Sequence, residues 1–448
     1  MRRENFAQWN AALRVAKGAV ELPQLLVIAD DLTGAADCGA ACARHGLSTD
    51  IVLGSDNCSE DVDVLSVDAD TRHLSADQAA AKTTAALRRH AGNGTRLLFK
   101  KLDSTLRGNV AAELAAVIEA CRTGARRPVA VLAPAFPAHG RTTRNGRQHI
   151  HGVPLEHTEM GRCGDAVHRS HLREILETAG LSSALLALDL VRCGDEALGL
   201  SMQHLAQQAD VLVCDAETDQ DLRAIADASM TIGPGVLWAG SAGLAYHLPV
   251  AAGVERSLTA PLTQLLASGP TLFVAGSLSS VTRQQVAALA ASPGLALFEV
   301  PIATLLAGEQ SPQWHATMQA VEQQLRSGAD LLVLPAADLQ AHAGSGPLIT
   351  AAIARLVQPC SAIAGALVAT GGETARAVMD SWDIRRFRVR AELEPGFPLS
   401  VTVGWKRQLP VLTKAGAFGN GNTLLHCRQF LHQLDRSGHA AAYTYKGI

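Results

Sequence analysis

Short apolar runs alternate along the chain with longer Ala- and Leu-rich stretches of helical periodicity. Apolar runs of this length, bounded by turn residues, are typical of buried strands. In the first half of the chain we predict strands at residues 25–29, 51–53, 62–67, 97–100, 129–132 and 211–214. Strands that alternate with helices predict a mostly parallel sheet covered by helices.

A Pro- and Gly-interrupted segment around residues 252–270 separates this series from a second one. The second series predicts strands at residues 272–275, 331–334, 367–369 and 411–413. We therefore expect two α/β domains with mostly parallel sheets and a cleft between them. Their expected extents are an N-terminal extension at 1–21, a first domain at 22–250 and a second domain at 268–448.

Composition narrows the class of protein. A net charge of −3 and an aromatic content of 4% argue against a nucleic-acid partner, which would need a basic surface or stacking side chains. The apolar runs are too short to span a bilayer, and no signal segment is recognised, so we expect a cytoplasmic protein without a membrane partner. The nine cysteines form no CxxC pair, and we expect reduced thiols without disulfides.

The first predicted strand runs directly into Asp30 and Asp31, and an apolar helix follows. Ligands of open α/β sheets bind beyond the carboxyl ends of the strands, which makes this position informative. One carboxylate can cap the helix or brace the loop, while the other faces the crevice and accepts a proton or binds a hydroxyl. An N-cap pair without further function is the simpler alternative.

Charged residues also follow later strands of the first domain. Lys101 and Arg107 can neutralise a carboxylate or phosphate, and the Asp103–Thr105 segment between them can bind hydroxyls or cap a helix. Arg72, after another strand, is a candidate carboxylate partner. Residues 133–146 form a stiff polar loop with two prolines, which suits either substrate orientation or a plain crossover.

The second domain carries glycine and hydroxyl residues at its strand ends. Such loops let backbone N–H groups surround an anion. They comprise Gly276, Ser277 and Ser279, then Thr370 to Thr374, and then Lys414 to Gly419. Neither a P-loop nor a G-x-G-x-x-G fingerprint occurs at a strand-to-helix turn, so an ordinary P-loop NTPase and a plain Rossmann dehydrogenase are both disfavoured.

Two further patterns predict structure without chemistry. The histidines at 139, 149, 151 and 157 have no spacing typical of a transition-metal site, and we predict no protein metal centre. Ser241 loosely matches the G-x-S-x-G esterase pattern. We interpret it as a packing turn, because Leu237 and Trp238 make a poor strand before it.

Taken together, these motifs resemble those of the four-carbon acid sugar kinase family. The resemblance extends from Leu25 over nearly the whole remaining chain. It rests on the segments IADDLTGAADCG, FKKLDSTLRGN, APAFPAHGRTTRNG, AGSLSSVTRQQ, ATGGETARAV and TKAGAFGN, which follow successive predicted strands.

The resemblance implies a first domain that binds a small-molecule sugar acid and a second domain that binds ATP. The residues implied for the substrate are Asp31, Arg72, Lys101, Leu102, Asp103 and Ser104. Those implied for ATP are Ser277, Gly371, Gly372, Glu373, Thr374 and Gly416. Phosphoryl transfer from ATP further implies Mg²⁺, which neutralises the β- and γ-phosphates. We expect Asp31 to be the catalytic base.

Within the family, the KKLDSTLRG stretch resembles D-threonate and D-erythronate kinases more than 3-oxo-tetronate kinases, which are the alternative. Ala417 stands where the family more often has glycine. The rival classes are a nucleotide-dependent sugar-acid dehydrogenase and a non-catalytic sensor. A homodimer is expected on base rates alone.

Overall fold

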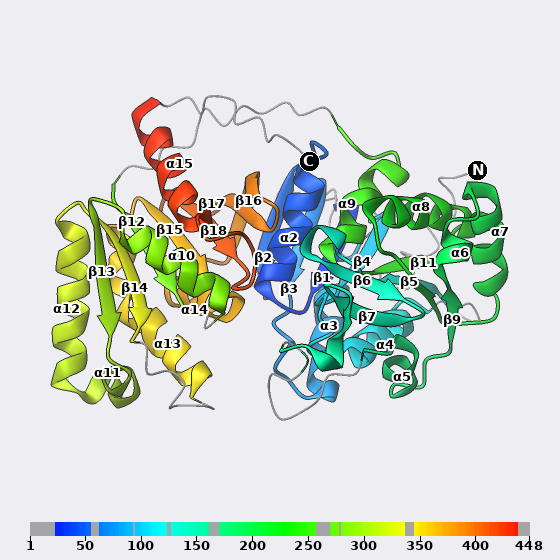
Figure 1. Ribbon diagram of the computed structural model, residues 1–448, viewed down its shortest axis with the longest axis horizontal. Coiled ribbons are helices and arrows are strands. Elements are labelled where there is room, and N and C mark those ends of the chain that lie inside the picture. Colours follow the sequence, from blue (N-terminus) through cyan, green and yellow to red (C-terminus); the bar gives the residue numbers. More distant parts are fainter. Residues whose placement is uncertain are drawn as a thin grey trace. The chain divides into compact units, whose positions relative to one another are not determined.

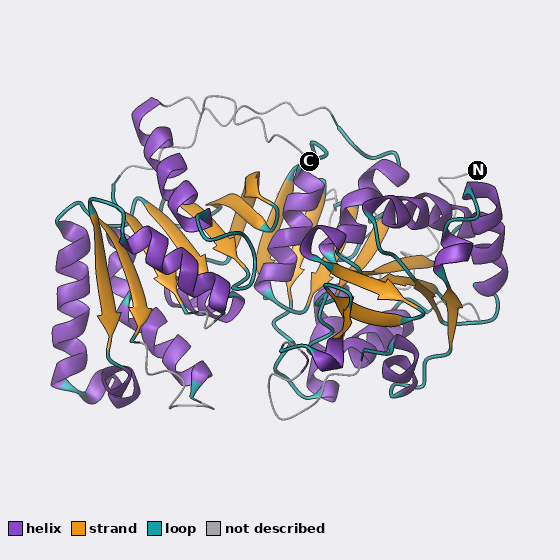
Figure 2. Ribbon diagram, viewed as in Figure 1, coloured by secondary structure: helices purple, strands orange, loops and turns teal. Residues whose placement is uncertain are grey.

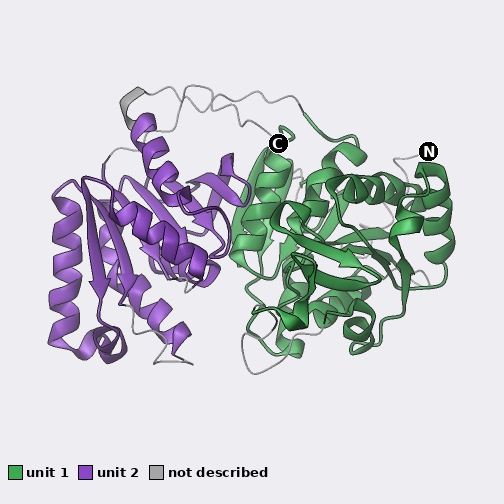
Figure 3. Ribbon diagram, viewed as in Figure 1, with its two compact units in different colours: residues 1–258 green, residues 259–448 purple. Residues whose placement is uncertain are grey.

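The computed structural model describes residues 23–54, 62–92, 95–122, 127–159, 161, 170–256, 269–276, 279–336 and 345–437. The chain divides into two compact units, residues 1–258 and 259–448 (Figure 3). The expected N-terminal extension at 1–21 lies outside the described residues.

The first unit is built on a sheet in which every strand pair is parallel. Its strand order is β2-β3-β1-β4-β11-β5-β10-β9. The strands are β1 (Leu25–Ala29), β2 (Thr49–Leu53), β3 (Val64–Asp68), β4 (Leu97–Lys101), β5 (Val129–Ala133), β9 (Ser183–Leu186), β10 (Val211–Cys214) and β11 (Val236–Gly240). The helices are α2 (Leu32–Ala43), α3 (Ala76–His90), α4 (Val110–Ala120), α5 (Leu172–Glu177), α6 (Leu188–Val191), α7 (Asp195–Leu205), α8 (Asp219–Ser229) and α9 (Ala242–Ala251).

Helices cover both faces of this sheet (Figure 2). In β1, Leu25 and Val27 pack into a core with α2, α8 and α9, whereas Leu26 and Ile28 pack into a second core with α3, α4 and α5. Side chains alternate between the faces of a strand, so a strand that is covered on both sides must be apolar throughout. This explains why the strands appear in the sequence as continuous apolar runs.

The chain reverses its direction across the sheet at β1. From β1 the chain first builds β2 and β3 on one side, and it then crosses back to place β4 on the other side (Figure 1). The carboxyl end of β1 therefore lies at a topological switch point, where open α/β sheets bind their ligands.

One strand contradicts the sequence prediction. Leu237 and Trp238 do form a strand, β11, in the middle of the sheet. Trp238 fits there because its side chain is buried in the core and its Nε1–H donates to Ser229 Oγ at 2.7 Å. Ser241 caps α9 and donates to Ala135 O at 2.5 Å, so the interpretation as a packing turn is confirmed.

The stiff loop expected after β5 contains secondary structure of its own. A short 3₁₀ helix is followed by a three-stranded antiparallel sheet. Its strands are β6 (Arg141–Arg144), β7 (Arg147–Ile150) and β8 (Val153–Pro154). The polar composition concealed these strands, because this sheet has little apolar alternation.

The second unit has a sheet with the order β13-β14-β12-β15-β18-β17-β16. The strands are β12 (Thr271–Ala275), β13 (Leu295–Val300), β14 (Asp330–Pro335), β15 (Ala366–Thr370), β16 (Arg386–Glu394), β17 (Phe397–Thr402) and β18 (Pro410–Lys414). The helices are α10 (Ser280–Ala290), α11 (Ile302–Ala307), α12 (Pro312–Arg326), α13 (Gly346–Leu356), α14 (Gly372–Ser381) and α15 (Thr423–Ser437). The pairs of β16 with β17 and of β17 with β18 are antiparallel, and the other pairs are parallel.

The structure thus confirms two α/β units with mostly parallel sheets. The cleft between them stays a prediction. Among the helices that the structure describes, none combines the length and apolar character that a bilayer-spanning segment requires.

Candidate functional site

The parallel register of the first sheet gathers three sequence motifs at one edge. Ala29 at the end of β1 pairs with Asp68 of β3 on one side and with Lys101 of β4 on the other. The segments that follow these strands carry Asp30 and Asp31, Arg72, and residues 102–107. Predicted substrate residues that are far apart in the sequence therefore meet.

Arg72 joins the two aspartates into one cluster. Its Nε donates to Asp30 Oδ2 at 2.8 Å and its Nη1 donates to Asp31 Oδ2 at 2.7 Å. Its Nη2 lies 3.9 Å from Asp103 Oδ1. The guanidinium is largely engaged by these carboxylates, which fix its plane and position.

The sequence pattern assigned the helix cap to one aspartate and the exposed position to the other, but Asp31 combines both features. It is the N-cap of α2, and its Oδ1 accepts from Gly34 N at 2.8 Å. Its side chain is also 15% exposed, against 3% for Asp30. Among the described residues, the Oδ1 atom of Asp30 is buried without a hydrogen-bond partner. Asp31 is therefore the carboxylate that a substrate can reach.

The two aspartates have opposite tendencies to ionise. Burial and the adjacent Asp31 carboxylate raise the pKa of Asp30, although Arg72 and the nearby lysines oppose this. Burial also favours neutral Asp31, but the Arg72 guanidinium, the Lys101 ammonium and the Thr33 hydroxyl together lower its pKa. Asp31 is consequently held as a carboxylate.

Lys101 brings an ammonium group to the same place. A Cβ atom on Gly34 would lie 2.5 Å from Lys101 Nζ and 2.8 Å from Asp31 Oδ1, so the absence of a side chain at residue 34 makes room for the ammonium beside Asp31. Within the described part of the chain, Lys101 Nζ has no hydrogen bond or ion pair. Burial works against the charge, but Asp30 and other acidic neighbours raise the pKa of Lys101, which stays cationic.

The remaining predicted substrate residues differ in what they offer. Asp103 is paired with Arg107, whose Nε donates to Oδ2 at 2.6 Å and Nη2 to Oδ1 at 3.1 Å. This pairing outweighs burial, so that the pKa of Asp103 is held well below its usual range. Leu102 is buried in the core, and its side chain is not available to a ligand. Ser104 is buried too, and its carbonyl accepts from Gln148 Nε2 at 2.8 Å.

The antiparallel sheet contacts this site through Gln148. This fully buried side chain accepts from Thr143 at 2.8 Å while it donates to Ser104 O. Arg141 lies near enough for Asp103 to influence its pKa, which burial lowers. Burial and Arg141 lower the pKa of His139 to about 4. The stiff segment thus packs against residues 103–104, and its role in orienting a substrate stays a prediction.

A buried ion pair beneath the site was missed from the sequence. Lys100 Nζ lies 2.8 Å from Glu113 Oε2, with both side chains almost completely buried. Lys100 also donates to Lys101 O at 3.0 Å, and Thr71 and Thr83 donate to Glu113 Oε2 at 2.9 and 3.2 Å. Because Thr71 precedes Arg72, the pair ties together the segments that carry the site residues.

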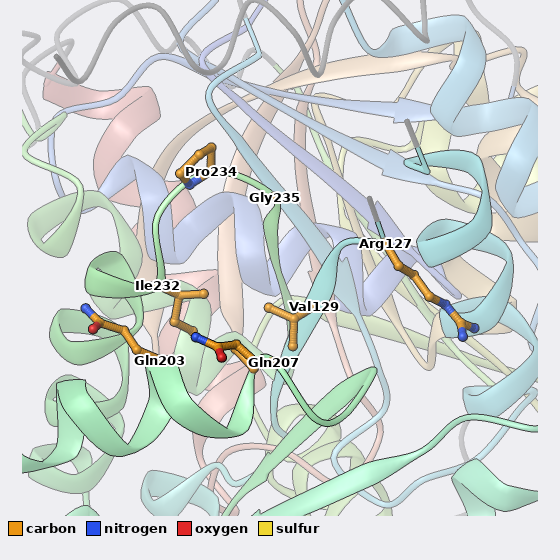
Figure 4. Close-up of a pocket in the computed structure, with 8 residues that line it drawn as sticks. Arg127, Val129, Gln203, Gln207, Ile232, Pro234 and Gly235 are labelled. Atoms are coloured by element: carbon orange, nitrogen blue, oxygen red, sulfur yellow. The ribbon is translucent and has the colours of Figure 1, made fainter. Parts of the chain in front are cut away.

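A pocket of about 380 Å³ in this unit lies elsewhere (Figure 4). Val129 and Gly235, which line it, lie at the amino ends of β5 and β11, the sheet edge opposite the candidate site. Arg127 at its rim is paired with Asp210 at 2.9 Å. We assign it no part in the chemistry.

In the second unit, the three glycine loops also follow neighbouring parallel strands. Ala275 of β12 pairs with Thr370 of β15, which pairs in turn with Lys414 of β18. Gly371 has φ +96°, a conformation that favours glycine, and caps α14 without a side-chain hydrogen bond. The predicted nucleotide residues Gly371, Gly372, Glu373, Thr374 and Gly416 therefore share one sheet edge. Ser277 lies outside the described residues.

We expect Gly276→Ala to weaken nucleotide binding. A Cβ atom at this position would stand 2.0 Å from Thr374 Oγ1, and the first turn of α14 would have to move. Each hydrogen bond lost between the displaced backbone and a charged phosphate costs about 1.5–3 kcal/mol, or roughly 10- to 150-fold in affinity. Calorimetric titration with ATP measures the loss, and Gly346→Ala, where no atom lies within 4 Å and the backbone φ is not positive, is the control. Equal affinity for ATP in wild type and Gly276→Ala would show that neither Gly276 nor the start of α14 contacts the nucleotide.

Groups of three or more metal-ligating side chains are absent from the described residues. That the chain supplies no metal centre of its own stays a prediction.

Each of the two units matches a known protein-family model. Residues 25–248 match the model of a sugar-binding N-terminal domain, and residues 272–424 match that of a nucleotide-binding C-terminal domain. A D-threonate kinase of Cupriavidus necator is 40% identical over 90% of this chain and 97% of its own length. A 3-oxo-tetronate kinase of Methylobacterium radiotolerans is 29% identical over 88% and 96%. A crystal structure of a Salmonella typhimurium LT2 protein shares the fold, with a TM-score of 0.76 at 23% identity over 90% of this chain and 98% of that one.

Proposed function

The chain belongs to the four-carbon acid sugar kinase family, and from this premise we propose that it uses ATP to phosphorylate the terminal 4-hydroxyl of D-threonate. The observation that supports a sugar-acid substrate most directly is the Lys101 ammonium beside Asp31, which is held cationic by its acidic neighbours and makes no hydrogen bond or ion pair with a described residue. The D-threonate kinase at 40% identity favours D-threonate over D-erythronate and 3-oxo-tetronate, the alternatives.

In this proposal Lys101 and Arg72 attract the carboxylate of the acid. Lys101 makes the direct ion pair, because the Arg72 guanidinium already donates to Asp30 and Asp31. A charge-assisted contact of this kind both holds the acid and excludes neutral sugars.

Asp31 accepts the proton of the terminal hydroxyl. Its lowered pKa keeps it ionised, and its Oδ2 is oriented by Arg72 and by Thr33, which donates at 2.5 Å. An ionised, oriented carboxylate aligns the attacking oxygen, and in phosphoryl transfer alignment and charge neutralisation provide most of the acceleration.

The second unit binds the phosphates of ATP through the backbone N–H groups of its glycine loops. The loops fit such a group, because Gly371 carries no side chain in a backbone with φ +96°, and the N–H groups of Gly416, Ala417 and Gly419 have no hydrogen-bond partner among the described residues. We propose that Mg²⁺ arrives with the nucleotide and shields the β- and γ-phosphates, since the described residues hold no cluster of metal ligands.

The test is ATP consumption by the purified protein with Mg²⁺ and a panel of four-carbon acids. We expect turnover with D-threonate well above that with D-erythronate, the L-acids and 3-oxo-tetronates, and a product phosphorylated at O4 by phosphorus NMR. Turnover with another acid of the panel, and not with D-threonate, would make that acid the substrate in place of D-threonate. ATP binding without ATP consumption for any acid of the panel would favour the non-catalytic sensor. A change in nicotinamide absorbance in the presence of an acid would favour the dehydrogenase.

A further inference from the structure

The loop after β18 turns its carbonyl oxygens toward its own lysine. Lys414 Nζ donates to the carbonyl oxygens of Ala415 at 2.8 Å, Gly416 at 3.2 Å and Phe418 at 3.0 Å. The lysine is only 1% exposed. An ammonium has three N–H donors, and all of them are used within the loop.

The start of α10 holds the same loop from its other side. Ser279 Oγ and Thr282 Oγ1 donate to Gly416 O at 2.7 and 2.8 Å. Gln285 Nε2 donates to Phe418 O at 3.1 Å and to Asn420 O at 2.8 Å. Side chains from two separate segments thus occupy the acceptors of residues 415–420.

The donors of the loop are in the opposite situation. In the region that the structure describes, the N–H groups of Gly416, Ala417 and Gly419 have no hydrogen-bond partner. Gly419 has φ +81°, and a Cβ atom there would lie 2.5 Å from Thr423 Oγ1, so this backbone shape requires glycine. A loop with engaged carbonyls and unengaged N–H groups is suited to an anion.

We propose that Lys414 and Gln285 are positioning residues for nucleotide binding, which fix the loop at residues 415–420 so that its N–H groups receive a phosphate of ATP. Neither side chain touches the phosphate. The strand-end lysine therefore differs from a P-loop lysine, because its charge acts on the carbonyl side of the loop. The identity of the anion rests on the proposed function.

The experiment measures ATP affinity by calorimetry in the absence of the sugar acid. Lys414→Met and Gln285→Leu remove the donors with little change in size. We expect ATP to bind about 10- to 100-fold more weakly in Lys414→Met, because several charge-assisted hydrogen bonds are lost, and a smaller loss in Gln285→Leu. Lys406→Met, at an exposed lysine of the same unit, is the matched control and should bind ATP normally.

A second readout separates positioning from general damage. In steady-state assays, KM for ATP should rise while KM for the acid and kcat at saturating ATP change little, and the variants should keep the wild-type circular dichroism. Equal losses in all parameters, or unchanged ATP affinity in folded Lys414→Met and Gln285→Leu, would overturn the inference. If Lys414→Met does not fold, the ATP affinities of Thr282→Val and Gln285→Leu test the inference in its place.

The two proposals fail differently. A wild-type protein that binds ATP but phosphorylates no acid of the panel contradicts only the substrate. If the wild-type protein and the variants bind ATP equally well, only the positioning role of Lys414 and Gln285 is contradicted. A wild-type protein that does not bind ATP contradicts both proposals.

Discussion

Asp31→Asn should reduce kcat by about 100- to 10,000-fold, the range over which a positioned general base accelerates proton transfer. The substitution removes the charge that accepts the proton and that Arg72 neutralises. It should not unfold the protein, because asparagine is as good an N-cap as aspartate and α2 keeps its bond from Gly34 N. Single-turnover phosphorylation of D-threonate, with ATP affinity as the internal check, measures the effect.

Asp30→Asn is the matched variant for this test. The Asp30 carboxylate is buried behind Arg72, so its loss should shift KM for the acid through Arg72 more than it lowers kcat. If Asp31→Asn keeps near-normal kcat while Asp30→Asn loses it, the base assignment moves to Asp30. Near-normal kcat in both would remove the carboxylate base from the mechanism.

Lys101→Met should mainly raise KM for the acid, whereas Lys100→Met should mainly lower the free energy of unfolding, although the two residues are adjacent. Lys101→Met should raise KM for the acid by about 10- to 150-fold, since a hydrogen bond to a charged group contributes roughly 1.5–3 kcal/mol. The free energy of unfolding should fall less than in Lys100→Met, because the Lys101 ammonium makes no hydrogen bond or ion pair with a described residue and offsets the charges of Asp30 and Asp31 only at longer range. Lys100→Met leaves Glu113 as an uncompensated buried carboxylate, and the free energy of unfolding should fall by about 3–5 kcal/mol.

Urea unfolding and steady-state kinetics on both variants make the comparison. Lys82→Met, at an exposed lysine that pairs with the exposed Asp70, controls for loss of a positive charge and should change neither quantity appreciably. A large rise in KM for Lys100→Met without loss of stability would contradict the division of roles between the two lysines.

The position of the candidate site was predictable because ligands of open α/β sheets bind where strands end. The apolar runs that end at Ala29, Phe99 and Ala369 predicted three strands that the structure confirms, whereas the roles of the polar residues after them stay predictions. The strand around Trp238 and the antiparallel sheet at residues 141–154 were missed. Their local patterns are ambiguous, and long-range packing decides such segments.

The sequence by itself determined the α/β class, the two series of strands, and the residue types available at each strand end. Only the tertiary structure decided which strand ends are neighbours, and therefore that Arg72 and Lys101 reach Asp31. It also decided the contacts of each charge: the Lys101 ammonium makes no hydrogen bond or ion pair with a described residue, whereas Lys100 pairs with Glu113 and Lys414 donates to backbone carbonyls. The reason is physical, since a charge acts through its neighbours and its burial, and both are set by segments distant in the sequence.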